Sequence, residues 1–368
     1  MCKRLICLVF LVAVPAAAES WKFAIAGDSR NCGDVVMPSI AAEVKGGGAK
    51  FYWHLGDYRA IYKYDEDMAK AANPPLNVIN YTNTAWTDFI KYQVDPFKPV
   101  PIYLGIGNHE TIPPKTKADF LAQFADWLLQ PPIVASRIDP NDHMLRTYYR
   151  WKQGGVDFLS LDNSTGDFDS NQLSWITKVL AKDAADPEVK AIVLGMHAAL
   201  PHSLGCDHSM NETASGEYSG SVVYKQLLDW RARTNKKVYV IASHSHFLLR
   251  DVYDSPYWRA HGGVIPGIII GTAGAIRYRL PDTAQNFPPE RAKTDVYGVL
   301  LATVADDGTI IWDFQQLDRA SVPPDVVSRY GAELVDWCFA ENRDTSPRTS
   351  EPCAKADAPC GPVQQQAH

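Results

Sequence analysis

The sequence lacks an excess of positive charge, a long internal apolar run and closely paired cysteines. The formal net charge is −6 at pH 7, so the chain has no general field that attracts nucleic acid or an anionic membrane. Its 10 tryptophans and 17 tyrosines are scattered, which gives no base-stacking platform for nucleic acid. Beyond the N-terminus no apolar stretch is long enough to span a bilayer. An anionic substrate would therefore need a local cation to hold it.

The seven cysteines do not have the spacing of a zinc knuckle, so a cysteine metal site has little support. Two of them lie in the N-terminal apolar segment. In an oxidising compartment the other five predict two disulfides and one free thiol. We expect Cys353–Cys360 to close a small loop near the C-terminus. We also expect Cys32–Cys206, because both residues follow strand ends that we place at the same rim.

The first 18 residues differ from the rest of the chain. Lys3 and Arg4 precede an apolar run over residues 5–14, and Ala16-Ala17-Ala18 supplies a small-residue cleavage site. This pattern is typical of a secretory signal peptide, whose apolar core is short for a membrane anchor. A buried N-terminal strand or helix is the alternative. We predict a signal peptide over 1–18 and a secreted or periplasmic protein.

Apolar runs of strand length alternate along the chain with segments of helical periodicity. Several runs are almost wholly apolar, as expected for strands covered on both faces. This alternation predicts an α/β fold with helices layered on mixed β-sheets. We expect Asp34 and Ser170 to cap the helices that they begin. The expected strands are 22–26, 50–55, 100–105, 148–152, 156–161, 191–196, 237–242, 267–270 and 296–304, and the expected helices are 34–43, 116–129, 170–182 and 218–233.

The chain shows no internal repeat and no interdomain linker, so we expect one domain over 19–342. Residues 296–304 and 310–314 flank a Gly-containing turn and predict a hairpin. After Asn342 the sequence is polar and proline-rich, which predicts a flexible tail over 343–368 that contains cysteines.

Long polar loops beside strand ends often form a substrate pocket. The loops expected here are 73–83, 198–217, 255–263 and 278–293.

Five expected strands each end on an aspartate, an asparagine or a histidine. The carboxyl end of the strands is where ligands gather in an α/β sheet. Carboxylates can bridge two metal ions, and imidazole and amide groups complete their coordination. Two ions about 3.5–4 Å apart can share a hydroxide and clamp a phosphoryl group. The endings are Asp28-Ser29-Arg30, Gly56-Asp57-Tyr58, Gly107-Asn108-His109-Glu110, Met196-His197 and Ser243-His244-Ser245-His246.

The order of these endings resembles the calcineurin-like metallophosphoesterase superfamily, which includes purple acid phosphatases and many phosphodiesterases. The family's motifs are D-x-H, G-D, G-N-H-D/E, a lone His after a strand and G-H-x-H. Their counterparts here cover residues 22–246, and Gly271-Thr272-Ala273-Gly274 resembles the family's small-residue turn after the last metal motif. The resemblance implies the family's fold, a sandwich of mixed β-sheets flanked by helices.

The resemblance also implies a set of metal ligands. Asp28 and His246 would hold the first ion, and Asp57 would bridge both ions. The two ions would be divalent or mixed-valence Mn, Fe or Zn, with Ni also compatible with these ligand types. The residues completing the second ion would be Asn108, His197 and His244.

For catalysis the resemblance implies that a bridging hydroxide attacks phosphorus without a covalent phospho-enzyme. His109 would face the substrate, as an acid for the leaving group or as a phosphate contact. Glu110 would orient His109 or the loop. His54, which precedes the second motif, is expected in the core or supporting a ligand, and Arg59 either touches substrate or packs the loop.

Two positions depart from the family pattern. Many members have histidine where this chain has Arg30, and arginine is not a metal ligand. Arg30 is interpreted either as a bidentate donor to the phosphate or as a surface or ion-paired residue. Purple acid phosphatases place tyrosine where this chain has Ala60, so we do not expect their colour-giving tyrosine–iron bond.

The sequence therefore predicts a metal-dependent hydrolase of a small phosphorylated substrate. A phosphomonoester is favoured, because Arg30 could bind a terminal phosphate dianion. A phosphodiesterase or a nucleotide pyrophosphatase is the alternative within the class. A non-catalytic phosphate- or metal-binding protein on the same scaffold is the alternative of another class, and only Arg30 favours it. The pocket loops set the substrate, and neither the substrate nor the oligomeric state follows from the sequence.

Overall fold

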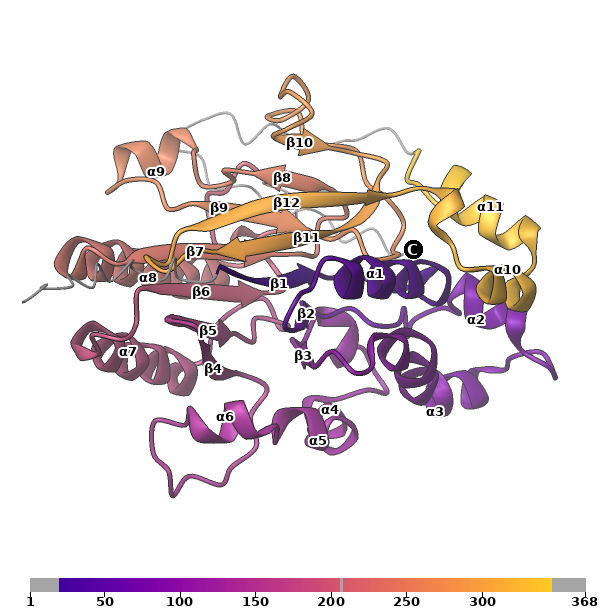
Figure 1. Ribbon diagram of the computed structural model, residues 1–368, viewed down its shortest axis with the longest axis horizontal. Helices are drawn as coiled ribbons and strands as arrows, with labels where there is room; N and C mark the ends of the chain where they lie inside the picture. Colours follow the sequence, from indigo (N-terminus) through magenta and orange to yellow (C-terminus); the bar gives the residue numbers. More distant parts are fainter. Residues whose placement is uncertain (1–19, 206–207, 346–368) are drawn as a thin grey trace, which may run out of the picture.

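The computed structural model describes residues 20–205 and 208–345. The predicted signal peptide, the pair Cys353–Cys360 and most of the predicted tail lie outside the described residues. Two mixed β-sheets flanked by helices make up the fold (Figure 1), which confirms the predicted α/β class. Among the described helices, none is long and apolar enough to cross a membrane.

The first sheet has five strands in the order β12-β11-β1-β2-β3, and β1, β2 and β3 are parallel. The second has seven strands in the order β10-β8-β9-β7-β6-β5-β4, and β5, β6, β7 and β9 are parallel. The bounds are β1 Trp21–Ala26, β2 Tyr52–His54, β3 Ile102–Leu104, β4 Tyr149–Gln153, β5 Val156–Ser160, β6 Ala191–Met196, β7 Lys237–Ala242, β8 Leu248–Arg250, β9 Gly267–Ile270, β10 Ala292–Lys293, β11 Tyr297–Val304 and β12 Ile310–Leu317.

Aromatic side chains join the two sheets face to face. Phe23 on β1 meets Phe158 on β5 with ring centroids 5.0 Å apart, and Trp53 on β2 meets Trp151 on β4 at 4.9 Å. Val193 on β6 belongs to this inner core, whereas its neighbours in sequence point to the outer face of the second sheet. Both faces of the strand are thus covered, which explains its continuous apolar sequence.

Helices cover the outer faces of both sheets. Helix α1 contacts β11 and β12 of the first sheet, and α7 and α8 pack on the outer face of the second. The bounds are α1 Gly33–Gly46, α2 Glu66–Ala71, α3 Val78–Phe89, α4 Lys117–Gln123, α5 Ala125–Leu128, α6 Pro131–Ala135, α7 Ser170–Ala185, α8 Ala214–Thr234, α9 Pro256–Ala260, α10 Pro324–Tyr330 and α11 Ala332–Ala340.

Several local predictions were wrong. Asp169, not Ser170, caps α7 by accepting the Gln172 N–H at 2.8 Å. Asp34 lies inside α1 and binds Arg59 instead of capping. The predicted loop 73–83 contains the start of α3, because Asn77 caps that helix and its apolar stripe is buried. The elements that were not predicted include strands β8 and β10 and helices α2, α6, α9, α10 and α11, and α9 lies within the predicted loop 255–263. The predicted helix 116–129 is divided into α4 and α5.

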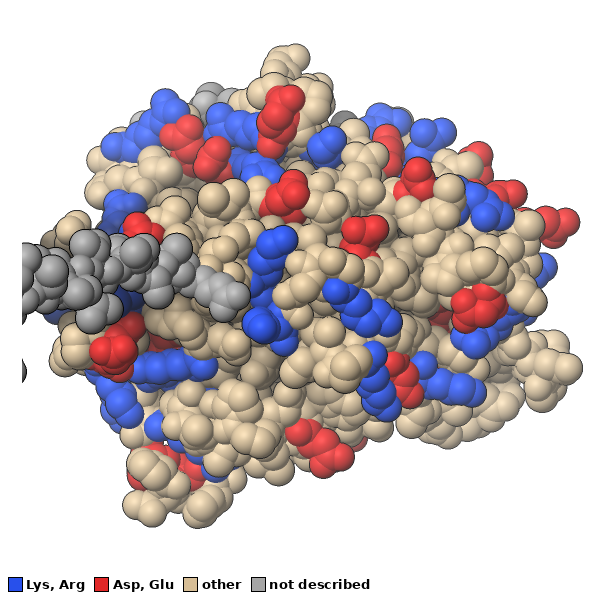
Figure 2. Space-filling model, viewed as in Figure 1, with Lys and Arg blue, Asp and Glu red and all other residues tan. Residues whose placement is uncertain are grey.

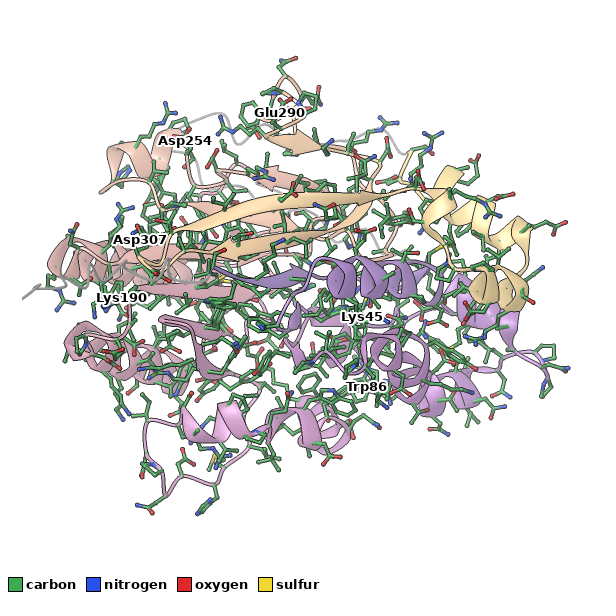
Figure 3. All side chains as sticks on the ribbon, viewed as in Figure 1. Lys45, Trp86, Lys190, Asp254, Glu290 and Asp307 are labelled. Atoms are coloured by element: carbon green, nitrogen blue, oxygen red, sulfur yellow. A yellow bond between two sulfur atoms is a disulfide. The ribbon has the colours of Figure 1, made fainter. Side chains whose placement is uncertain are left out.

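The predicted hairpin is confirmed by the antiparallel pairing of β11 and β12. Its turn reaches the second sheet, where Lys237 Nζ donates to Asp307 Oδ2 at 3.0 Å in an ion pair (Figure 3 labels Asp307). Gly308 in the turn has φ +78°, a conformation that favours glycine.

On the face in Figure 2, acidic and basic side chains are interspersed, as expected for a chain without a field of one sign.

One disulfide is present in the described residues, between Cys32 and Cys338. The predicted pair Cys32–Cys206 is therefore wrong, because a sulfur forms one disulfide and that of Cys32 is directed at α11. Cys32 precedes α1 and Cys338 lies in α11, and both are fully buried. The bond ties the C-terminal helix to the loop that follows β1.

Replacing Cys32 and Cys338 by serine should lower the free energy of unfolding by about 2–5 kcal/mol, because the bond closes a very long loop in the unfolded chain. Urea unfolding without reductant measures the change. Each single serine variant should lose about as much as the double variant, since both act through one bond. Unchanged stability in the double variant would show that the bond does not hold α11 in place.

Candidate metal centre

The residues singled out from the strand endings come together at one edge of the sandwich. Each stands just after a strand, and the strands belong to both sheets. A backbone hydrogen bond joins the two sheets at this edge, because the Gly27 N–H after β1 donates to Ile270 O at the end of β9 at 3.1 Å. The residues and their strands are Asp28 after β1, Asp57 after β2, Asn108 and His109 after β3, His197 after β6, and His244 and His246 after β7.

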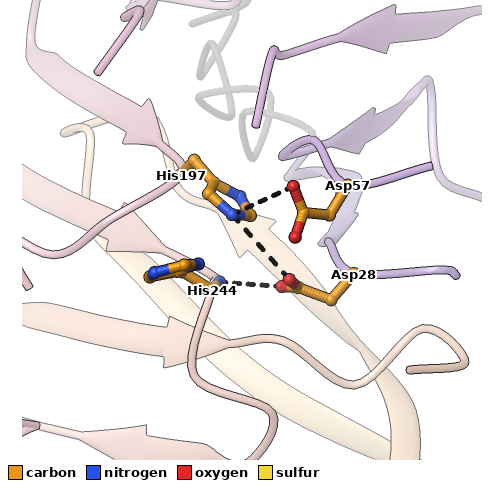
Figure 4. Close-up of side chains that lie close together, drawn as sticks. All are labelled: Asp28, Asp57, His197 and His244. Carbon is orange, nitrogen blue, oxygen red and sulfur yellow. Dashed lines mark hydrogen bonds and ion pairs between the residues drawn. The ribbon is translucent and has the colours of Figure 1, made fainter. Parts of the chain in front are cut away.

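Four of these residues form a compact group of metal-binding type. One ligand atom each from Asp28, Asp57, His197 and His244 lies within 4.8 Å of the others (Figure 4). His197 Nε2 lies 3.2 Å from Asp57 Oδ1, 4.0 Å from Asp28 Oδ1 and 2.9 Å from Asn108 Oδ1. Carboxylate, amide and imidazole groups thus converge on one point.

Backbone carbonyls fix the orientation of three site histidines. Nδ1 of His197 lies 3.0 Å from Leu55 O, and Nδ1 of both His109 and His246 lies 2.6 Å from a carbonyl oxygen. Nδ1 of His197 also lies 3.1 Å from the Ser243 hydroxyl, which can donate or accept. In His109 and His246 the carbonyl only accepts, so Nδ1 carries the proton and Nε2 of the neutral ring presents its lone pair to the site. This is the arrangement found for histidines that bind metals through Nε2.

Two buried carboxylate oxygens have no hydrogen-bond partner. They are Asp28 Oδ1 and Asp57 Oδ2, on side chains that are 0% and 1% exposed. A buried charge without a partner is costly, and His246 Nε2, 3.2 Å from Asp28 Oδ1, offers a lone pair rather than a proton. The donor set therefore fits a cation between these oxygens and nitrogens.

The electrostatics of the group point the same way. Burial alone would lower the pKa of His197, but the carboxylates of Asp57 and Asp28 outweigh it and raise the pKa to about 9. His109 differs, because burial lowers its pKa to about 4 against the opposing attraction of Asp57. The electrostatic potential is therefore more negative at His197, beside the carboxylates of Asp57 and Asp28, than at His109.

The loops that carry these side chains adopt an uncommon backbone conformation. Asp28, Asp57 and His244 have φ of +62°, +60° and +63°, a region that non-glycine residues seldom occupy. Hydrogen bonds hold them there, since Asp28 N–H donates to Gly56 O at 3.0 Å and His244 N–H to Asp28 Oδ2 at 2.8 Å. Such outliers cluster at functional sites, where the surroundings enforce them.

Glu110 holds two of the loops. Its carboxylate accepts the N–H groups of Gly107 and Asp57 at 2.8 Å and of Tyr58 at 2.9 Å. Burial, reinforced by the charge of Asp57, raises the pKa of Glu110 to about 7. The carboxylate is occupied by the backbone, so Glu110 acts as a positioning residue for the second and third motifs.

Arg30 is 5% exposed and points into the site, which rules out the surface interpretation. Its Nε lies 3.8 Å from Asp57 Oδ2, and its Nη2 lies 3.4 Å from His246 Nε2. Nη1 donates to Tyr62 OH at 3.3 Å and Nη2 to Tyr278 OH at 3.4 Å. Burial opposes the charge, yet Tyr278 and Asp57 raise the pKa of Arg30 above its usual value, so the guanidinium stays protonated.

The two tyrosines beside Arg30 were not predicted as site residues. Tyr62 is 43% exposed and its ring lies 5.4 Å from that of His109. Tyr278 stacks on His246 with centroids 4.0 Å apart. Tyr278 begins a loop that the sequence marked only as long and polar, and no motif singled it out.

Other candidates have structural roles. His54 Nδ1 accepts the Gly56 N–H at 3.2 Å and its Nε2 lies 2.9 Å from Ser29 Oγ, so it supports the loops. Arg59 is fully buried and binds the carboxylates of Asp34 at 2.5 Å, Asp67 at 3.2 Å and Asp88. Its contact with substrate is thereby excluded, and loop packing is its role.

A second group of metal-binding type adjoins the first. It consists of His208, Glu212 and His244, whose ligand atoms lie within 4.8 Å of one another. His208 and Glu212 are much more exposed than the first group, and His208 Nδ1 lies 3.5 Å from Glu212 Oε1. This group extends the rim of the site.

The family described as calcineurin-like phosphoesterase matches residues 32–248. Comparison with curated proteins gives no match. Among solved structures, purple acid phosphatase PPD1 from yellow lupin (Lupinus luteus) seeds is similar, with a TM-score of 0.52, 16% identity, and coverage of 82% of this chain and 52% of the lupin chain. PhoD has a TM-score of 0.48 and 15% identity, with 80% of this chain and 65% of PhoD covered. This chain thus spans about half the length of the lupin protein, whose likeness shows a shared fold.

Gly107→Ala should weaken metal binding. An added Cβ would lie 2.2 Å from Asp57 Oδ1 and 2.9 Å from His197 Nδ1, so these side chains must move. If the strain of overpacking, about 1–3 kcal/mol, falls on the bound state, the affinity for Mn²⁺ should drop by about 5- to 150-fold, as measured by calorimetric titration.

Gly46→Ala is the matched control, because no atom lies within 4 Å of its added Cβ. This control should bind Mn²⁺ like the unaltered protein. Equal affinities of all three proteins would contradict a metal centre that depends on the position of Asp57.

Proposed function

The chain belongs to the calcineurin-like phosphoesterase family, and we propose that it is a metal-dependent hydrolase of phosphate esters. One observation carries this proposal. Two buried carboxylate oxygens without partners, on Asp28 and Asp57, face the Nε2 lone pairs of His246 and His109 at the shared edge of the sheets. Positive charge at this edge, from a bound ion or from a guanidinium, offsets their charge and would bind a phosphate.

The residues divide into two candidate cation positions. Asp57 Oδ1, Asn108 Oδ1 and His197 Nε2, with His244 beside them, surround one position. Asp28 Oδ1, Asp57 Oδ2 and His246 Nε2 border the other, where the family resemblance implies a second ion. Bound ions in such sites lower the pKa of water to make a nucleophile and neutralise phosphate charge.

His109 is proposed to contact the substrate. Its Nδ1–H donates to Ala60 O, so Nε2 is the ring nitrogen that remains available to a ligand. Nε2 lies 3.6 Å from Asp57 Oδ2, on the same side as the candidate ions. There its lone pair can accept a proton or a hydrogen bond from a substrate oxygen. As an acid for the leaving oxygen or a donor to a phosphate oxygen it must be the imidazolium, which the lowered pKa restricts to acidic solution.

We favour a phosphomonoester as substrate over a phosphodiester. Arg30 brings a guanidinium to the site, and its buried Nε has no hydrogen-bond partner. A guanidinium matches the two exposed oxygens of a terminal phosphate dianion. A diester carries a single charge and would gain less from this group. A phosphodiesterase activity is the alternative.

Chelation should abolish hydrolysis of p-nitrophenyl phosphate, and Mn²⁺, Zn²⁺ or Fe²⁺ should restore it. Release of p-nitrophenol is the readout, with bis-p-nitrophenyl phosphate measured in parallel. Faster turnover of the monoester is expected from the Arg30 charge. Faster turnover of the diester would reverse the preference. Absence of turnover with every ion would leave a non-catalytic binding protein on the same scaffold.

His109→Ala should lower kcat by about 10²–10⁴-fold, the range for a group that moves a proton in the transition state. Metal content should stay unchanged, because the contact from His109 to Asp57 Oδ1 is made by the backbone N–H at 3.0 Å. His261→Ala, at an exposed histidine stacked on Tyr257, is the matched control and should retain full activity. Unchanged kcat in the His109 variant would remove this residue from the mechanism.

A further inference from the structure

We propose that the guanidinium of Arg30 takes the place of one of the two metal ions and that this centre binds a single divalent ion. The inference deepens the proposed function and rests on it, because it concerns how the same site obtains its positive charge. It replaces the two-ion centre implied by the family resemblance.

The guanidinium lies beside two of the groups that border one of the two cation positions, His246 and Asp57. Nη2 is 3.4 Å from His246 Nε2, and Nε is 3.8 Å from Asp57 Oδ2. Because His246 Nδ1 carries the ring proton, its Nε2 lone pair accepts from the guanidinium. The group that would bind an ion at this position is thus already engaged by a positive charge.

An ion and the guanidinium would compete for the same lone pair. A divalent ion bound to an imidazole lies about 2.0–2.1 Å from the nitrogen, so it would be crowded against Nη2. Arginine does not lose its proton in a protein, which would leave two cations in close contact beside a side chain that is 5% exposed. The repulsion and the crowding both exclude the ion.

Neighbouring side chains hold Arg30 in this place. Tyr62 OH and Tyr278 OH accept from its two terminal nitrogens at 3.3 and 3.4 Å. The Tyr278 ring covers His246 at a centroid distance of 4.0 Å. The residue is 5% exposed, so its side chain is enclosed and does not extend into solvent.

The other cation position is free of the guanidinium. There His197 Nε2 lies 3.2 Å from Asp57 Oδ1 and 2.9 Å from Asn108 Oδ1. His244 lies beside these atoms. One divalent ion at this position and one guanidinium, set against two carboxylates, leave a small net positive charge. That charge attracts a phosphate, and the unpartnered Arg30 Nε–H can bind one of its oxygens.

Metal stoichiometry tests the proposal. Metal-free protein is titrated with Mn²⁺, bound ions per chain are counted by elemental analysis, and electron paramagnetic resonance distinguishes isolated from exchange-coupled Mn²⁺. The unaltered protein should bind one isolated ion. Arg30→His should bind two coupled ions, because it removes the competing charge and adds an imidazole. Arg319→His, at a surface ion pair with Asp336, is the matched control and should bind one.

Two coupled ions in the unaltered protein would overturn the proposal, and so would a single ion in a folded Arg30→His variant. Arg30→Gln is the second variant if the histidine variant does not fold, and it should gain a second, weaker ion. A single bound ion without turnover of either ester would refute the proposed hydrolysis while leaving the one-ion centre intact. No bound ion in the unaltered protein would refute both.

Discussion

Two negative charges, on Asp28 and Asp57, are buried together where the sheets meet, and much of the surrounding structure serves to keep them there. Each carboxylate leaves one oxygen without a hydrogen bond. Neighbouring charges of one sign repel each other, and burial makes them costly. The positive-φ loops, the glycines that leave room for the carboxylates and the three backbone N–H groups bound by Glu110 all maintain an arrangement that only a cation makes favourable.

The fold allows residues far apart in sequence to share this task. Parallel strands end at the same edge of each sheet, and the face-to-face packing brings the two edges together. A residue placed just after a strand therefore reaches the centre without a long loop of its own. Carbonyl oxygens then fix the rings of His109 and His246, so the scaffold sets the tautomers of these two histidines as well as their positions.

The sequence predicted the parts of the structure that depend on local pattern. Strand-length apolar runs located the sheets, and their polar endings located the candidate centre, because strand direction alone brings such endings together. It failed where tertiary packing decides. The partner of Cys32 depends on where α11 packs, and Tyr278 reaches Arg30 from a loop without a motif. The orientation of Arg30 was open for the same reason, since a long side chain follows its neighbours.

The disulfide can form only after nearly the whole domain has been synthesised. Cys32 is made early, and its partner lies 306 residues further along. Cys32 must therefore remain reduced, or be released from another partner, while nearly the whole domain is made, and Cys206 appears well before Cys338 does. Because the bond anchors the segment that carries Arg30, the centre gains its covalent closure only after the last helix has been made.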